Sequence, residues 1–308
     1  MSMSIVVPET WQAIPSDALR GVVMVVGAVD TGKSSLVRYL WQRVTQQKHP
    51  GDVPAVIDAD IGQAVLGPPT TQTLRLAHPE SFTDFPPRGR LARWFVGAIS
   101  PRGHMLPTVV GLHRLVQQAR RWGARTILVD TTGMVHPQVG GVALKWAEFD
   151  LLEPHTVIAL QREGELEPLI GPWRHSQRFR LIELTTSPHV RPRSREERIA
   201  WRQYRFQVYF RHARDMVLDV QHLPRLGGGR LFPGRLLGFL DRRGFLVALG
   251  VLRGWEGHRW TVFTPLRDIA RVDAIRLGSI GLDGQLRDHR PPPREEGGKV
   301  LGEPSRRE

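Results

Sequence analysis

Residues 27–34 constrain the fold of this chain most strongly. They read Gly-Ala-Val-Asp-Thr-Gly-Lys-Ser and match the pattern GxxxxGK[ST] without a mismatch. An apolar run at residues 22–26 precedes them, and residues 34–47 have helical spacing. A strand, a glycine-rich turn and a helix in this order form a cradle whose backbone N–H groups hold phosphates. A chance glycine-rich turn is the alternative, but the flanking elements favour a nucleoside triphosphate site.

The residues of this cradle have separate expected roles. Lys33 is expected to reach the β- and γ-phosphates, and the Ser34 hydroxyl is expected to bind Mg²⁺. The expected nucleotide-binding residues are Gly27, Ala28, Val29, Asp30, Thr31, Gly32, Lys33, Ser34 and Ser35.

Strand and helix patterns alternate along the first two thirds of the chain. Further strands are expected at residues 54–57, 93–99, 126–129, 156–160 and 180–184, a helix at 108–122, and a loop-rich segment at 64–93. This alternation predicts an α/β fold: a P-loop kinase-like parallel sheet covered by helices on both faces.

The pattern changes after residue 214 to short apolar runs broken by glycines, with a hairpin turn at 241–244. We therefore expect a small C-terminal β-rich domain. The predicted organisation is an N-terminal lead-in at 1–20, a P-loop domain at 21–214, the β-rich domain at 215–283 and a disordered tail at 284–308.

Polar clusters follow three of the predicted strands. Asp58 and Asp60 follow the strand at 54–57, and Ser100 follows the strand at 93–99. The third cluster begins at Asp130 and continues with Thr131, Thr132 and Gly133. Ligands bind beyond the carboxyl ends of parallel strands, so these clusters are candidates for contacts with a ligand, although each is also compatible with a plain turn or helix start. Ser34, Asp58 and Asp130 are the expected Mg²⁺ residues.

The charge of the chain is uneven. Residues 174–214 hold eleven arginines against three glutamates, which is +8 of the formal net charge of +13. Arg198, Arg202 and Arg205 fall on one face of a predicted helix within a lid at about 191–210. Such a stripe suits a polyanion or transferring phosphates, and a solvated arginine-rich surface is the alternative.

Composition excludes several classes of protein. The chain has no cysteine, which rules out a disulfide partner, thiolate metal ligands and a cysteine nucleophile. No apolar run reaches the roughly 18 residues needed to cross a bilayer. We therefore expect a cytoplasmic protein with no membrane partner.

Together these motifs resemble the polynucleotide 5′-hydroxyl kinase family, which includes the RNA kinases of pre-mRNA cleavage, tRNA splicing and pre-ribosomal RNA processing. The family's DxDxGQ motif matches Asp58, Asp60, Gly62 and Gln63, and its G-x-x-SP element matches residues 97–101. Its clasp, T-x-G-W, matches Thr131 and Gly133 but has Met134 in place of the tryptophan. Its lid of spaced arginines followed by Tyr-Phe matches residues 193–210.

The resemblance implies an enzyme that transfers the γ-phosphate of ATP, or of another nucleoside triphosphate, with Mg²⁺. The acceptor is the 5′-OH end of single-stranded RNA, with DNA left open. The implied catalytic residues are Lys33, Asp58, Asp60, Arg198, Arg202 and Arg205, with either aspartate as the proton acceptor. The implied acceptor-binding residues are Gln63, Ser100, Thr131, Thr132, Gly133 and Met134.

Two other functions stay open at this stage. One is a nucleotide-dependent RNA-binding or assembly protein that transfers nothing, and the other is a kinase for a small metabolite. The strand at 156–160 is followed by Gln-Arg-Glu-Gly and not by the Asn-Lys-x-Asp that reads guanine, which disfavours a GTPase switch. The sequence does not decide between ATP and GTP and leaves the oligomeric state open.

Overall fold

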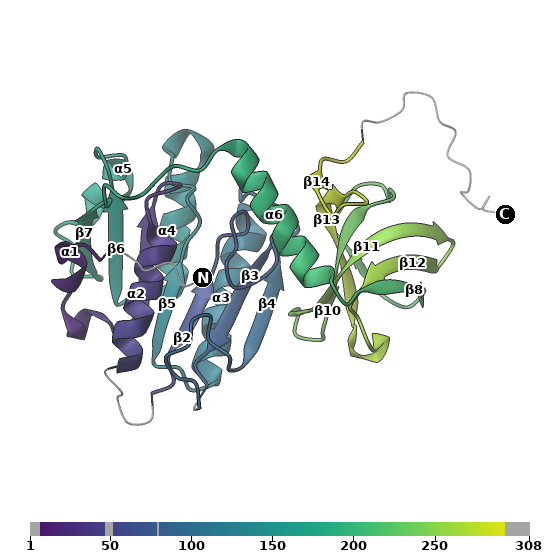
Figure 1. Ribbon diagram of the computed structural model, residues 1–308, viewed down its shortest axis with the longest axis horizontal. Coiled ribbons are helices and arrows are strands. Elements are labelled where there is room, and N and C mark those ends of the chain that lie inside the picture. Colours follow the sequence, from purple (N-terminus) through teal and green to yellow (C-terminus); the bar gives the residue numbers. More distant parts are fainter. Residues whose placement is uncertain (1–6, 47–51, 79, 293–308) are drawn as a thin grey trace, which may run out of the picture.

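The computed structural model describes residues 7–46, 52–78 and 80–292. Its first sheet has seven strands in the order β4-β3-β2-β5-β1-β6-β7 (Figure 1). The strands are β1 Gly21–Gly27, β2 Ala55–Asp58, β3 Thr71–Leu76, β4 Leu91–Phe95, β5 Thr126–Asp130, β6 Thr156–Gln161 and β7 Arg180–Thr185. Five neighbouring strands, β2, β5, β1, β6 and β7, pair in parallel. By contrast, β3 is antiparallel to both β2 and β4. The predicted α/β fold is confirmed, with a mixed edge.

The prediction that residues 64–93 are loop-rich is wrong for β3 and for the start of β4. β3 begins with the polar residues Thr71, Gln72 and Thr73, so the sequence lacks the apolar run that predicts a buried strand. Two of these side chains donate hydrogen bonds inside the fold: Thr71 Oγ1 to the carbonyl of Pro68 at 2.7 Å, and Gln72 Nε2 to the carbonyl of Thr108 at 3.0 Å. β4 also ends at Phe95, earlier than expected, and Gly97 follows with a φ of 82°.

Helices cover both faces of this sheet. On one face, α2 (Lys33–Gln46) packs its apolar side against β1, β5 and β6. On the other face lie α3 (Met105–Arg121) and α4 (Gly141–Leu152), which also contact each other. The shorter helices of the described residues are α1 Glu9–Gln12, α5 Glu167–Ile170, η1 Ser16–Ala18, η2 Pro137–Val139, η3 Gly171–Trp173 and η4 Ile269–Arg271.

The N-terminal segment packs more closely than a polar lead-in would. Trp11 and Ile14 are buried in the core beside α2. Arg43 of α2 donates to the carbonyl of Ile14 at 2.8 Å, and Thr156 Oγ1 donates to the carbonyl of Ala18 at 2.7 Å. Residues 7–20 therefore contribute to the first domain.

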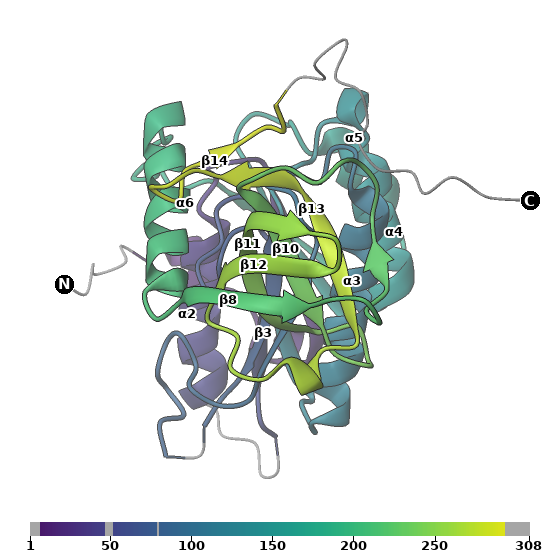
Figure 2. The ribbon, with the colours of Figure 1, turned by 90° about the vertical axis from the view of Figure 1, so that its right-hand side faces the viewer.

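A second, largely antiparallel sheet follows, in the order β14-β13-β10-β11-β12-β8, with β9 paired to β13. Figure 2 views this sheet face-on, with α6 (Arg195–Phe210) along one side. Its strands are β8 Arg214–Asp219, β9 Arg225–Leu226, β10 Arg235–Leu240, β11 Leu246–Glu256, β12 Arg259–Thr264, β13 Ala274–Leu282 and β14 Asp288–His289. The predicted hairpin turn at 241–244 is confirmed, since Gly244 donates to the carbonyl of Asp241 at 2.8 Å.

The two sheets share a core beneath α6. Phe206 and Phe210 of α6 are buried there together with Phe95 at the end of β4. A Cβ on Gly238 would lie 2.3 Å from the Phe95 ring, so β10 must have glycine at this position. Ser279 of β13 donates to the carbonyl of Gly97 at 2.8 Å. The second sheet therefore fixes the loop that begins at Gly97.

The expected disordered tail from residue 284 is wrong for residues 284–292. β14 pairs with the end of β13, and Asp288 bonds to Arg202 of α6. Residues 293–308 lie outside the described part of the chain. Within the described part, no helix has the length and apolar character that crossing a bilayer requires.

Candidate active site

The turn from β1 into α2 has the backbone of a phosphate cradle. Asp30 and Gly32 adopt positive φ angles of 55° and 93°. A Cβ on Gly27 would lie 2.7 Å from the carbonyl oxygen of Leu160 and 2.6 Å from the Thr31 hydroxyl, so only glycine fits there. Lys33 Nζ donates to the carbonyl of Ala28 at 2.7 Å, which folds its side chain over the turn. Burial lowers the pKa of Lys33, and the nearby Asp130 opposes that shift.

Asp130 is the last residue of β5 and lies beside Ser34 of the cradle. Ser34 Oγ donates to Asp130 Oδ2 at 2.6 Å. Asp130 Oδ1 is buried and has no hydrogen-bond partner among the described residues. Burial raises the pKa of Asp130 to about 6, and the charge of Lys33 acts against that rise. A buried carboxylate oxygen without a partner, next to a serine hydroxyl, suits a hard cation.

Asp58 ends β2 directly beside Asp130, its register partner on β5. Its Oδ2 accepts hydrogen bonds from the backbone N–H groups of Val65 and Leu66 at 2.6 and 2.8 Å, and its Oδ1 accepts from Asp60 at 3.1 Å. Burial raises the pKa of Asp58 to about 7, and the Asp130 charge adds to this rise. Asp58 thus holds the following loop in place and shares a buried, electronegative region with Asp130.

Asp60 lies two residues further along the same loop. Its Oδ1 accepts from the N–H groups of Gly62 and Gln63, both at 2.9 Å, which leaves Oδ2 for an outside hydroxyl. A Cβ on Gly62 would lie 2.6 Å from the carbonyl oxygen of Ile99. Glycine at this position therefore lets the Asp60 loop press against the loop that carries Ser100.

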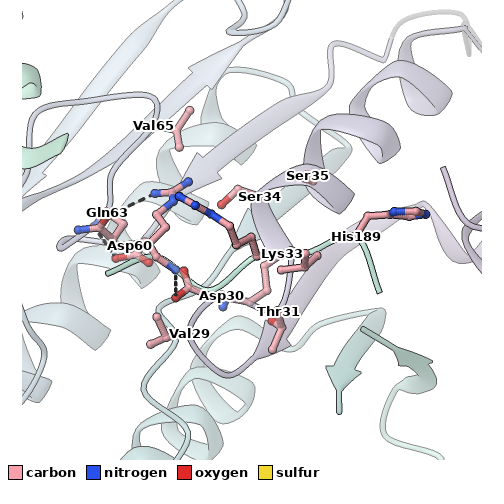
Figure 3. Close-up of a pocket in the computed structure, with 14 residues that line it drawn as sticks. Val29, Asp30, Thr31, Lys33, Ser34, Ser35, Asp60, Gln63, Val65 and His189 are labelled. Atoms are coloured by element: carbon pink, nitrogen blue, oxygen red, sulfur yellow. Dashed lines mark hydrogen bonds between the residues drawn. The ribbon is translucent and has the colours of Figure 1, made fainter. Parts of the chain in front are cut away.

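Two cavities meet at Asp60. The first cavity has a volume of about 370 Å³ and lies over the cradle. The site residues predicted from the sequence that line it are Val29, Asp30, Thr31, Gly32, Lys33, Ser34, Ser35, Asp60 and Gln63. Figure 3 shows Asp60 and Gln63 on one side of it and Lys33 and Ser34 on the other. The second, of about 600 Å³, is lined by Ser100, Met134 and Arg202 among others. Asp60, Gln63 and Val29 line both cavities.

The segment after β5 closes the second cavity. A Cβ on Gly133 would lie 2.9 Å from the backbone nitrogen of Val29, so glycine allows this segment to touch the cradle. Thr132 and Met134 line the cavity. Thr131 does not, because its side chain is buried and its Oγ1 donates to the carbonyl of Val25 at 2.8 Å. The contact of Thr131 with an acceptor therefore stays a prediction.

The lid helix α6 begins at a capping box, in which the Ser194 and Glu197 side chains bond to each other's backbone N–H. Arg198 forms an ion pair with Asp30 of the cradle at 2.6 Å. Arg202 reaches across to Asp288 with two bonds of 2.7 and 3.2 Å, and both side chains are nearly buried. Both arginines also line the second cavity.

Arg205 differs from the other two lid arginines. It lies beyond both cavities and donates to the carbonyl of Gly67 at 2.8 Å, with its guanidinium 5.7 Å from the Trp201 ring centroid. In this structure Arg205 lines neither cavity, whereas Arg198 and Arg202 line the second, so a catalytic role for Arg205 stays a prediction. Helical spacing put the three arginines on one face, but their partners come from three different segments.

Sequence reasoning missed several residues of the site. His189 and Val190 line the first cavity from the loop between β7 and α6, beside Arg191 of the predicted lid. His136 and Glu165 line the second. These residues belong to no motif, so only the folding of the chain brings them to the site. Asp288 was missed because it was assigned to the tail.

The residues present fit a magnesium ion bound with a nucleotide. Among the described residues, no three histidine or acidic side chains gather into a metal cage. Magnesium needs none, since it commonly uses one or two carboxylates, waters and substrate phosphates. Ser34 Oγ and the unpartnered Asp130 Oδ1 would supply protein ligands of this kind.

Comparison with known proteins identifies the family of this chain. The family model described as mRNA cleavage and polyadenylation factor CLP1 P-loop matches residues 27–212. Polyribonucleotide 5′-hydroxyl-kinases of Pyrococcus furiosus and Thermococcus kodakarensis are each 32% identical, over 84% of this chain and 86% and 87% of theirs. The enzyme of the same name from Methanocaldococcus jannaschii is 28% identical over 85% of this chain and 87% of its own.

The fold also has a solved counterpart. The structure of wild-type Clp1p in complex with Pcf11p matches with a TM-score of 0.63 and 14% identity, over 85% of this chain and 74% of that one. At this identity the match concerns the fold alone.

Proposed function

The chain belongs to the family of the mRNA cleavage and polyadenylation factor CLP1 P-loop, and we propose that it transfers the γ-phosphate of ATP to the 5′-hydroxyl end of a polyribonucleotide. The observation that carries this proposal is the meeting of two cavities at Asp60. A phosphate donor in one cavity and a hydroxyl in the other would face each other across a single carboxylate.

The first cavity suits the triphosphate. The cradle N–H groups and the N-terminus of α2 favour anionic oxygens, and Lys33 can turn from the Ala28 carbonyl to the β- and γ-phosphates. Ser34 and Asp130 would hold Mg²⁺, with Asp58 behind them. When bound, this ion would neutralise charge that develops on the phosphate oxygens. Arg198 is poised at the edge of the cradle through its bond to Asp30.

Asp60 is the residue that we assign as proton acceptor. Of the two candidate aspartates, it alone lines the cavities, and Oδ1 is anchored while Oδ2 stays available. Asp58 lines neither cavity and has both carboxylate oxygens engaged by backbone N–H groups. A base must lie within hydrogen-bond reach of the hydroxyl that it deprotonates, so position favours Asp60.

The second cavity suits the acceptor end. Gln63, Ser100 and Thr132 offer hydrogen bonds to a ribose, and Arg202 offers positive charge to its phosphate. Met134 lies where the family has tryptophan. A thioether packs against a base without the stacking of a π-face, so we expect weak selectivity for the first base.

The test is transfer of label from γ-labelled ATP to oligonucleotides. A 5′-OH RNA should be labelled, and the same RNA with a 5′-phosphate is the matched control that should not be. A 5′-OH DNA of the same sequence measures the preference for RNA. Lys33→Ala should abolish the transfer while the protein stays folded.

The same assay separates the other functions. ATP hydrolysis that ignores 5′-OH ends would point to a nucleotide-dependent assembly protein. Equal activity on free nucleosides and on oligomers would point to a metabolite kinase. Either result would contradict the proposed function.

A further inference from the structure

Three arginines gather under α6 outside both catalytic cavities. Arg93 of β4 is the register partner of Thr73 on β3, and Arg75 lies two residues along β3 from Thr73. Because side chains alternate along a strand, all three residues share one face of the sheet. Arg205 of α6 covers this face through its bond to Gly67.

The contacts tie these side chains together. The Arg93 guanidinium lies 5.8 Å from the ring centroid of Tyr209, which is one helical turn beyond Arg205 on α6. Gly67, which accepts the bond from Arg205, lies directly over Thr73: an added Cβ would be 2.0 Å from the Thr73 hydroxyl. The cluster is thus continuous from β4 through β3 to the lid helix.

The charge of these arginines is not paired with a carboxylate in the described part of the chain. The Nε atoms of all three, and the hydroxyl of Thr73, are buried without a hydrogen-bond partner in the described structure. The nearby Asp84 pairs instead with Arg88 at 2.9 Å. Asp58, whose charge acts on Arg205, is held by backbone N–H groups.

The electrostatics show the cost of this arrangement. Burial lowers the pKa of Arg75 and of Arg93, and the charge of Arg205 lowers both further. Arg75 Nη1 donates to the carbonyl of Pro87 at 3.2 Å, so Arg75 and Arg205 each have one neutral acceptor while their Nε atoms have none. Half-buried guanidinium groups that repel each other are stabilised by an anion with several acceptor oxygens.

We propose that Arg75, Arg93 and Arg205, with the Thr73 hydroxyl, form a binding site for a phosphate group. The phosphate can come from two sources: a phosphodiester of the acceptor strand beyond its 5′ end, or free inorganic phosphate. The first source rests on the proposed kinase function, and the second does not.

The first experiment uses inorganic phosphate alone. Thermal unfolding is followed as phosphate replaces chloride at constant ionic strength, with ADP and Mg²⁺ saturating the cradle. The wild-type midpoint should rise with phosphate. The apparent affinity should fall on the order of tenfold in Arg75→Gln and in Arg93→Gln, because each loses charge-assisted bonds. Arg90→Gln is the matched control, since Arg90 lies near the same sheet edge but packs on Trp122.

The second experiment varies acceptor length in the kinase assay. If the strand supplies the phosphate, KM should fall as the 5′-OH RNA lengthens, and Arg93→Gln should lose that advantage by about tenfold while Arg90→Gln keeps it. If phosphate raises the unfolding midpoint of the wild type but Arg93→Gln keeps the wild-type dependence of KM on RNA length, the site binds free phosphate. If Arg93→Gln fails to fold, Arg75→Gln gives both readouts.

One pair of results would overturn the proposal: no phosphate-dependent rise in the wild-type midpoint, together with equal length dependence in the wild type and both variants. If no kinase activity is found, the unfolding experiment still decides, so failure of the site is distinguishable from failure of the proposed function.

Discussion

Replacing Asp60 with asparagine isolates proton transfer from the shape of the site. In this structure the N–H groups of Gly62 and Gln63 donate to Asp60 Oδ1 at 2.9 Å. The amide oxygen of Asn can still accept both bonds, so the loop should keep its fold. The other side-chain atom becomes an NH₂ group, which cannot accept a proton from the acceptor hydroxyl. Only the chemistry at the junction of the two cavities should change.

The expected loss follows from the role of a general base. Positioned proton acceptors contribute about 10²–10⁴-fold, so Asp60→Asn should reduce kcat by that factor, or about 2.7–5.4 kcal/mol in the barrier. The cost in folding should be small, because a charged acceptor is exchanged for a neutral one, a difference of about 1 kcal/mol. The Kd for ATP should stay within about threefold of the wild-type value.

The assay is label transfer at saturating ATP and 5′-OH RNA, with ATP affinity and thermal unfolding measured on the same preparations. Asp58→Asn is the matched comparison. Asp58 lines neither cavity. The fold-loss of kcat in Asp58→Asn should therefore be at least ten times smaller than the fold-loss in Asp60→Asn. Turnover of Asp60→Asn within about threefold of wild type, with a larger loss in Asp58→Asn, would refute the assignment.

Three further predictions concern the surroundings of the site. Gly133→Ala should displace the cradle backbone, costing about 1–3 kcal/mol in unfolding free energy and weakening ATP binding, as measured by denaturation and titration. Asp288→Asn should leave Arg202 without its two-bond partner and raise the acceptor KM about tenfold, with ATP binding unchanged in steady-state kinetics. The raised pKa values of Asp58 and Asp130, about 7 and about 6, mean that the folded protein binds more protons than the unfolded chain between about pH 4 and pH 7. Stability of the nucleotide- and metal-free protein should therefore fall from pH 5 to pH 8 in denaturation experiments, and Mg²⁺ should stabilise it more at pH 8.

The parts of the fold that follow from local physics could be predicted. The strand, turn and helix around Lys33 have their own sequence signals, and Gly27 and Gly32 meet steric needs that only glycine satisfies. Asp58 and Asp130 end neighbouring parallel strands, so their proximity follows from the order of strands in the sheet.

The parts of the fold that depend on distant partners could not be predicted from the sequence. β3 is polar, and its place as a buried strand depends on pairing with β2 and β4 and on partners such as Thr108 of α3, which accepts a bond from Gln72. The arginine spacing placed Arg202 and Arg205 on one helix face, but a partner eighty-six residues away decides where Arg202 points. Asp288 itself sits in a charged, proline-flanked segment whose composition resembles a disordered tail.

We propose that donor and acceptor occupy adjoining cavities that meet at Asp60. A bisubstrate compound, with adenosine joined through a polyphosphate to the 5′-oxygen of a short RNA, tests it directly by calorimetry. If the cavities adjoin, both halves bind together and the compound should bind at least 10²-fold more tightly than either ATP or the RNA alone. A compound that binds no more tightly than the better of its halves would contradict the account.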